Sequence, residues 1–179
     1  MRKRNAFLLI VAAIVCALGL GALVASLYSV FSLARVRARA QTSAQNMSAL
    51  HKAFTMYEVD YGRFPVDAVP DQSLFLLYRQ YVDDFRVFYN PNDMREKPIG
   101  EPREGGASAR IRTEFADSCG YMYLPGYSSA DGNAIFYYER FPTANRRNVL
   151  YVNGQVDLID EAEFQNRLTN NPKPVPIAK

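Results

Sequence analysis

The residues that could do acid–base or nucleophilic chemistry are few and scattered in this sequence. His51 is the only histidine, and the sequence places no cysteine, serine or carboxylate where it would form a dyad with it. A surface or half-buried position on a helix is the better interpretation of such a histidine. Asp83 and Asp84 are adjacent, so their side chains cannot share one helix face as an acid–base couple. The sequence therefore predicts no catalytic residue and a protein that is not an enzyme.

A few oxygen-bearing side chains are weak candidates for a metal site. Asp117, Asp131 and Asn133 flank the first expected strands, and calcium takes carboxylate and carboxamide oxygens as ligands. Turns use the same residue types. The cysteine and histidine spacings of metal sites and the glycine-rich loop of a phosphate site are absent. We therefore expect no cofactor, with calcium as the one alternative.

The net charge of +3 over 179 residues conceals an uneven distribution of charge along the chain. Residues 1–40 contain six basic and no acidic side chains, which leaves 15 basic and 18 acidic residues in the rest of the chain. Nucleic-acid binding would require basic residues clustered on the folded domain, and no such cluster is seen. The basic residues flank an apolar segment instead, where they can meet lipid headgroups.

Residues 6–33 form an apolar segment that is long enough to cross a bilayer, preceded by a basic flank at residues 1–5. As a helix, 28 residues rise about 42 Å, against a hydrocarbon core of about 30 Å. A cleaved secretory signal is the alternative, but its apolar region is normally only about 7–15 residues long. The sequence thus predicts a retained transmembrane helix. Cys16 lies within it and Cys119 beyond it, so no intramolecular disulfide is expected.

One face of this segment carries small side chains at every fourth position. These residues are Ala13, Ala17, Gly21 and Ala25, followed by Ser29. Helices associate in lipid by close packing, and small residues allow close approach. The alternative is that alanine and glycine are simply common in membrane helices. The pattern predicts a helix-packing ridge.

The helix is expected to continue beyond the membrane over residues 34–60. Met47, Leu50, Phe54 and Tyr57 fall on one apolar stripe, and no proline or glycine interrupts residues 34–58. Gly62 supplies a left-handed stop with Pro65 just beyond.

The remainder, residues 61–170, has the pattern of a small α+β domain. Residues 73–88 suggest a second helix and residues 95–114 a surface excursion. Short runs of aromatic and β-branched residues then predict strands at 121–124, 134–139, 148–152 and 155–159, the last two joined by an Asn153-Gly154 turn. Asp160 and Glu163 suggest a capping box that begins a final short helix. Residues 171–179 are expected to be an extended, proline-rich and loose tail.

Three short motifs in this layout resemble the type IV pilins and the major pseudopilin of type II secretion. The long helix ends in Tyr-x-x-x-Tyr-Gly-Arg-Phe-Pro (Tyr57 to Pro65), and Gly120-Tyr-Met-Tyr-Leu-Pro and Arg147-Asn-Val-Leu-Tyr-Val-Asn-Gly-Gln-Val are similar to the sheet of these prepilin-type proteins. In the family's processing motif a glycine precedes the cut, and a glutamate follows within the new N-terminus. The best match here is Ala6-Phe7, with Ala6 in place of the glycine and Val11 in place of the glutamate. The resemblance therefore predicts poor processing by prepilin peptidase.

Together these observations predict an α+β fold in which a long N-terminal helix packs on a small antiparallel sheet. The resemblance implies a structural or assembly subunit of a type II secretion or type IV pilus-like apparatus. Its partners would be the lipid bilayer and other pilin-like subunits, and its location the bacterial inner membrane, with the soluble domain outside the cytoplasm. The alternative is a membrane-anchored binding module whose sheet presents aromatic rings to a ligand: Tyr121, Tyr123, Tyr127, Phe136, Tyr137 and Tyr138.

Overall fold

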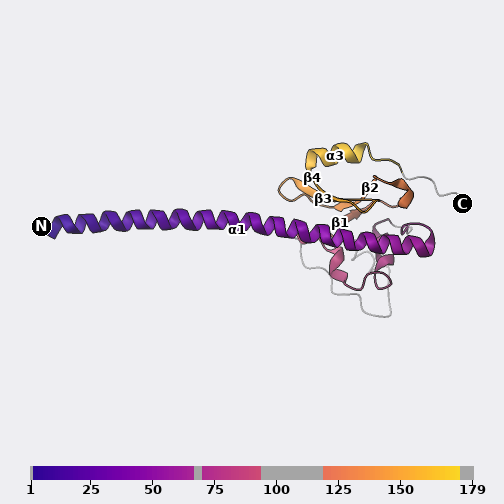
Figure 1. Ribbon diagram of the computed structural model, residues 1–179, viewed down its shortest axis with the longest axis horizontal. Coiled ribbons are helices and arrows are strands. Elements are labelled where there is room, and N and C mark those ends of the chain that lie inside the picture. Colours follow the sequence, from indigo (N-terminus) through magenta and orange to yellow (C-terminus); the bar gives the residue numbers. More distant parts are fainter. Residues whose placement is uncertain (1, 67–69, 94–118, 174–179) are drawn as a thin grey trace. The chain divides into compact units, whose positions relative to one another are not determined.

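The computed structural model describes residues 2–66, 70–93 and 119–173 (Figure 1). The chain divides into two compact units, residues 1–38 and 39–179. The predicted surface excursion at 95–114, Asp117 and most of the proline-rich tail lie outside the described residues.

The N-terminal helix α1 spans Arg2–Tyr61, close to the expected range. It contains no proline and no glycine after Gly21. It ends at Gly62, whose φ of +74° is the left-handed conformation that glycine adopts most readily and whose N–H bonds to the carbonyl of Glu58 at 2.7 Å.

Four antiparallel strands form one sheet in the order β1-β2-β3-β4. The strands are β1 (Tyr121–Tyr123), β2 (Ile135–Glu139), β3 (Arg146–Tyr151) and β4 (Val156–Asp160). The helix α3 (Glu161–Thr169) follows β4 directly. The part of α1 in this unit and α3 cover opposite faces of the sheet (Figure 1). The predicted fold class, a long helix packed on a small antiparallel sheet, is confirmed.

The larger core lies between α1 and the sheet. The predicted stripe is confirmed, because Met47, Leu50 and Phe54 are fully buried and Tyr57 is partly buried against the same cluster. Phe54 stacks on Tyr123, with ring centroids 5.1 Å apart. A smaller core on the other face joins five buried side chains: Ile135, Val149, Tyr151, Ile159 and Phe164.

A register shift in β2 decides which of its side chains face α1. The pairing with β3 slips between Ile135 and Tyr137, so Phe136 and Tyr137 both join the α1-side core while Ile135 lies on the α3 side. A bulge interrupts strict alternation in this way. Its consequence is that Glu139 also points toward α1, where it meets Ser43.

Two local expectations from the sequence are wrong. Residues 73–88 form two 3₁₀ helices, η1 (Pro70–Leu77) and η2 (Phe85–Phe88), separated by a turn in which Arg79 has φ +68°. The three-residue turn of a 3₁₀ helix suits the buried pairs Leu74/Leu77 and Phe85/Phe88.

The second concerns Asp160, which occupies the N-cap position of α3 but whose side chain makes no capping bond. Its carboxylate lies 3.4 Å from Arg146 Nε instead.

The start of the C-terminal segment is held more firmly than the sequence suggests. The side chain of Asn171 exchanges two hydrogen bonds with the backbone of Ile135, at 2.8 and 2.7 Å. Tyr127 Oη donates to the carbonyl of Pro172 at 2.7 Å. The expectation of a loose tail from residue 171 onward is therefore wrong for its first residues.

The β2–β3 and β3–β4 turns use left-handed backbone. In the predicted Asn153-Gly154 turn, only Gly154 has positive φ (+87°), so one position rather than both uses this freedom. The β2–β3 hairpin closes at Ala144 and Asn145, with φ +50° and +60°, between Thr143 and Arg146, which exchange two backbone hydrogen bonds. Positive φ at both central residues is typical of a type I′ turn. Alanine is an unfavourable residue there, because its Cβ crowds the backbone.

Replacement of Ala144 by glycine should therefore stabilise the protein. The relief of left-handed strain exceeds the added entropy of the unfolded chain, for a net gain of about 0.5–1 kcal/mol. Ala162→Gly, at an exposed position inside α3, is the matched control and should cost about 1 kcal/mol. Urea unfolding of the detergent-solubilised protein measures the free energy of unfolding of each variant. An equal loss of this free energy in the two variants would contradict the turn assignment.

Candidate functional site

The buried carboxylate of Glu139 joins α1 to the sheet. Glu139 is 1% exposed. Its oxygens accept hydrogen bonds from Ser43 Oγ of α1 at 2.5 Å, from the Asn148 backbone N–H at 3.0 Å and from Asn148 Nδ2 at 3.0 Å. Asn92 Nδ2 approaches at 3.4 Å. A buried carboxylate is tolerated only when its oxygens are satisfied in this way.

The same junction reaches the backbone of α1 and the segment after η2. Asn148 Nδ2 also donates to the carbonyl of Ala40 at 3.0 Å. Tyr121 Oη lies 3.2 Å from Ser43 Oγ, and Asn46 Nδ2 donates to the carbonyl of Tyr89 at 3.2 Å. Burial raises the pKa of the Tyr121 phenol above its usual value, so this ring stays neutral and can donate a hydrogen bond. Three chain segments thus meet in one polar network.

Arg147 extends the junction to α3 on the other face of the sheet. Its guanidinium pairs with both carboxylate oxygens of Glu161, at 2.8 and 2.7 Å, and donates to the carbonyl of Glu139 at 2.7 Å. It also lies 4.1 Å from the centre of the Phe164 ring. Burial alone would raise the pKa of Glu161, but the hydrogen bonds from Arg147 and Gln165 outweigh it and lower that pKa. The Glu161 carboxyl group is therefore ionised at neutral pH, where it faces the buried Arg147.

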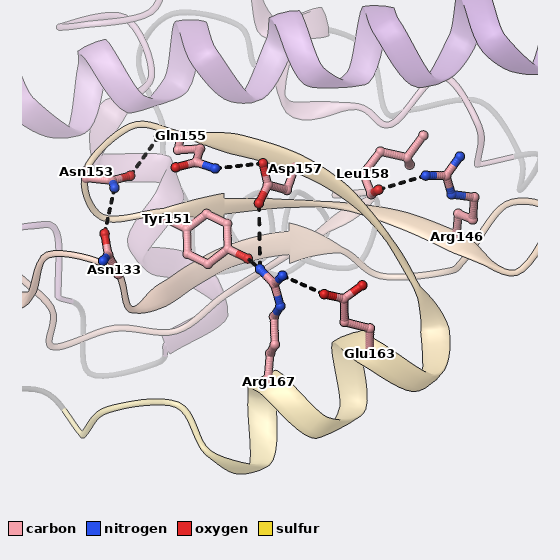
Figure 2. Close-up of polar contacts among 9 residues, drawn as sticks. All are labelled: Asn133, Arg146, Tyr151, Asn153, Gln155, Asp157, Leu158, Glu163 and Arg167. Carbon is pink, nitrogen blue, oxygen red and sulfur yellow. Dashed lines mark hydrogen bonds and ion pairs between the residues drawn. The ribbon is translucent and has the colours of Figure 1, made fainter.

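A shallow polar groove of about 390 Å³ lies between α3, the β3–β4 hairpin and the segment after α3. Arg167 is its central cation, and Figure 2 shows it directed toward Tyr151, Asp157 and Glu163. Its guanidinium donates to Tyr151 Oη and to Glu163 Oε1, the latter at 2.5 Å, and lies 3.6 Å from Asp157 Oδ2.

The groove offers hydrogen bonding rather than reaction chemistry. Burial raises the pKa of Tyr151, and Arg167 opposes that shift only in part, so the phenol is protonated at neutral pH. The other polar lining residues are carboxamides: Asn133, Gln155, Asn170 and Asn171. None of these groups is a nucleophile or a base tuned to neutral pH.

The predicted metal candidates take part in turns. Asp131 Oδ2 accepts from the backbone N–H of Ser128 at 2.7 Å, and Asn133 Oδ1 accepts from Asn153 Nδ2 at 2.8 Å. Asp117 lies outside the described residues. Within the part of the chain that the structure describes, no group of three or more His, Cys, Asp or Glu side chains is gathered to hold a metal ion.

His51 is half-buried on α1, in agreement with its sequence interpretation. Its Nε2 lies 2.9 Å from the carbonyl of Val152, and its ring meets Phe136 edge-on. A Cβ at Gly154 would come within 2.8 Å of this ring, so His51 and Gly154 fit one another. The histidine supports the β3–β4 turn.

The candidate aromatic face of the sheet is buried. Tyr121, Tyr123, Tyr127, Phe136 and Tyr137 are all at most 5% exposed, and Tyr138 packs partly against the α3-side core. The alternative, a binding module that presents these rings to a ligand, is therefore weakened, because the rings are not on the surface.

The processing and packing candidates lie on the part of α1 that belongs to the first unit, residues 1–38. Ala6, Phe7, Val11, Ala13 and Ala17 are helical. Gly21 and Ala25 are exposed on the helix, and a Cβ at Gly21 would meet nothing within 4 Å. The ridge is therefore open to another helix at Gly21 and Ala25, and whether one docks there stays a prediction.

No protein-family description, curated protein or solved structure matches this chain. The resemblance to pilin-like proteins accordingly rests on the three motifs and on the layout of helix and sheet.

The Glu139 junction should be the largest single polar contribution to the stability of the domain. Glu139→Ala leaves the Asn148 N–H and the Ser43 hydroxyl buried without their acceptor, which should cost about 3–5 kcal/mol. Glu139→Gln keeps one carbonyl acceptor and should cost less. Glu163→Ala, which removes an exposed ion pair of α3, should cost under about 1 kcal/mol. Denaturant unfolding measures all three, and a Glu139→Ala loss no larger than that of Glu163→Ala would contradict this role.

Proposed function

We propose that this chain is a membrane-anchored, pilin-like structural or assembly subunit of a type II secretion or type IV pilus-like apparatus. The observation that carries the proposal is α1 itself, a single helix with an uncharged apolar stretch at residues 5–34 and a C-terminal part that packs into the domain's core. This arrangement fixes a folded domain directly to a helix that is suited to lipid or to a bundle of like helices.

The exposed side chains of α1 support a membrane environment. By length and composition, α1 can cross a membrane, the only such helix in the described part of the chain. Its large apolar side chains between residues 20 and 33 are 48–65% exposed: Leu20, Leu23, Val24, Leu27, Val30, Phe31 and Leu33. An apolar surface of this extent is covered in a stable protein, here by lipid or by neighbouring helices.

The domain fits a structural role better than a catalytic one. Its buried polar residues, notably Ser43, Glu139, Arg147 and Asn148, are used to connect α1, the sheet and α3. We place the anchor in the bacterial inner membrane, with the domain on the extracytoplasmic side, as the pilin-like resemblance implies.

Lateral association through the small-residue ridge is the form of assembly that we infer. With Val11 in place of the family's glutamate, a buried N-terminal ammonium would lack its negative partner, at a cost of several kcal/mol. The ridge needs no such partner, because it acts by close approach. A dimer or an adaptor or capping subunit is therefore favoured over a long homopolymer.

Crosslinking in membranes tests this assembly. Gly21→Leu should strongly reduce crosslinked dimer or crosslinked partner subunits, because leucine blocks close approach along the ridge. Gly19→Leu is the matched control, since Gly19 is two residues away, on the other side of the helix, and equally open.

Two outcomes would overturn the proposal. Equal crosslinking of both variants and the unaltered protein would remove the ridge as an interface. Long filaments of the protein alone in electron micrographs would contradict the argument from Val11.

A further inference from the structure

The strand β4 lies at one edge of the sheet, and the backbone groups that it turns outward can be assigned from its pairing with β3. It is last in the strand order, so no further strand of the described residues lies on its other side. The Tyr151 N–H donates to the Gln155 carbonyl, and the Glu161 N–H donates to the Asn145 carbonyl, both at 2.9 Å. Residues of an antiparallel pair alternate between facing the partner strand and facing away from it. The register then places three residues at the positions that face away: Val156, Leu158 and Asp160.

The carbonyl of Leu158, in the middle of β4, is capped by the side chain of Arg146. Figure 2 shows the guanidinium directed at this carbonyl, with Nη2 3.0 Å from the oxygen. Asn148, which pairs with Leu158 in the register, donates its own backbone N–H to Glu139 on the side of β2. The Leu158 carbonyl therefore points to the outer edge of the sheet, where the guanidinium of Arg146 takes the place that an incoming N–H would need.

Arg146 is held over this edge by an exposed ion pair. Its Nε lies 3.4 Å from Asp160 Oδ1, and the two side chains are 51% and 67% exposed. Exposed pairs of this kind contribute little to the stability of a protein. The pair thus orients the guanidinium, and the arginine can be replaced without unfolding the domain.

The edge that Arg146 covers is otherwise suited to strand pairing. The outward N–H and C=O groups of an edge strand are a template for another strand, and charged side chains are one of the means by which proteins block such pairing. Leu158 adds an apolar side chain that is 38% exposed at the centre of the strand. The contact of Arg146 with the Leu158 carbonyl is therefore an obstacle at the point where a new strand would pair.

A second copy of β4 fits this edge because the outward-facing positions are symmetric about Leu158. In an antiparallel pair with a two-fold axis at this residue, Leu158 meets its own counterpart, and Val156 meets Asp160 of the other copy. The outward backbone groups of each strand then face those of the other. The remaining carboxylate of β4, Asp157, lies 3.6 Å from Arg167 of its own chain, so its charge is offset within each copy.

We propose that Arg146 guards the edge of β4 against antiparallel pairing with β4 of a second copy. The edge opens when the guanidinium leaves the Leu158 carbonyl. The guard thereby keeps contacts between copies to other surfaces of the protein. The proposal concerns the unit of residues 39–179 and does not rest on the membrane anchor.

Crosslinking at Leu158→Cys tests the guard in the full-length, detergent-solubilised protein. The two native cysteines are first replaced by Cys16→Ala and by Cys119→Ser, whose hydroxyl can still donate to the Phe88 carbonyl. Asp160→Asn is then compared with Asp160→Asn plus Arg146→Ala, so that only the guard differs and no carboxylate is left without its partner. Paired strands hold the two Cα atoms of residue 158 about 5.5 Å apart. A short bismaleimide should therefore give severalfold more crosslinked dimer when Arg146 is absent.

Two further variants serve as controls. Arg146→Lys should keep crosslinking low, because an ammonium group can still donate to the Leu158 carbonyl. Ala162→Cys, exposed on α3 and outside β4, should show no increase when Arg146 is replaced. Circular dichroism checks that each variant is folded.

Three results would overturn the proposal. Equal crosslinking at Leu158→Cys with and without Arg146 would show that the arginine is no guard. The absence of dimer in both proteins would show that β4 does not pair with a second copy. An equal increase at Ala162→Cys would place the contact between copies away from the edge of β4.

Discussion

The buried carboxylate of Glu139 is the interaction on which the rest of the domain depends. It draws α1, the β2–β3 pair and the segment after η2 to one point, because each supplies a hydrogen-bond donor to its oxygens. The bulge in β2 is what turns this side chain toward α1. Arg147 passes the constraint through the sheet to Glu161 of α3. Apolar packing supplies most of the driving force for folding, and this polar network selects one register of α1 against the sheet.

That constraint has a consequence for function. A helix attached to its domain only by apolar contacts could slide or rotate, whereas hydrogen bonds from Ser43 and to the Ala40 carbonyl fix both its depth and its rotation. The part of α1 that contains Ala40 and Ser43 therefore moves together with the sheet. The membrane-anchored assembly subunit that we propose would use this property.

Much of this fold follows from sequence patterns with strong local causes. Residue patterns within the segment itself predict the long helix, its end at Gly62, the four strands and the β3–β4 turn at Gly154. The 3₁₀ helices were not predictable, because leucine and phenylalanine at three-residue spacing also suit an α-helix. The site residues Ser43, Glu139 and Asn148 were missed, since polar residues in an amphipathic pattern are normally solvent-facing and only the bulge and the tertiary packing reverse this. The Ala144-Asn145 turn carries no glycine and so lacks the usual signal.

Native-state hydrogen exchange tests most directly whether α1 and the sheet form one cooperative unit. Amides of α1 between Asn46 and Phe54 and amides of β3 should exchange with the same free energy of opening, equal to that of global unfolding, and Glu139→Gln should lower both together. If the α1 amides instead open at a clearly lower free energy while those of β3 stay protected, the helix is only docked on an independently stable sheet, and the Glu139 junction does not unite them.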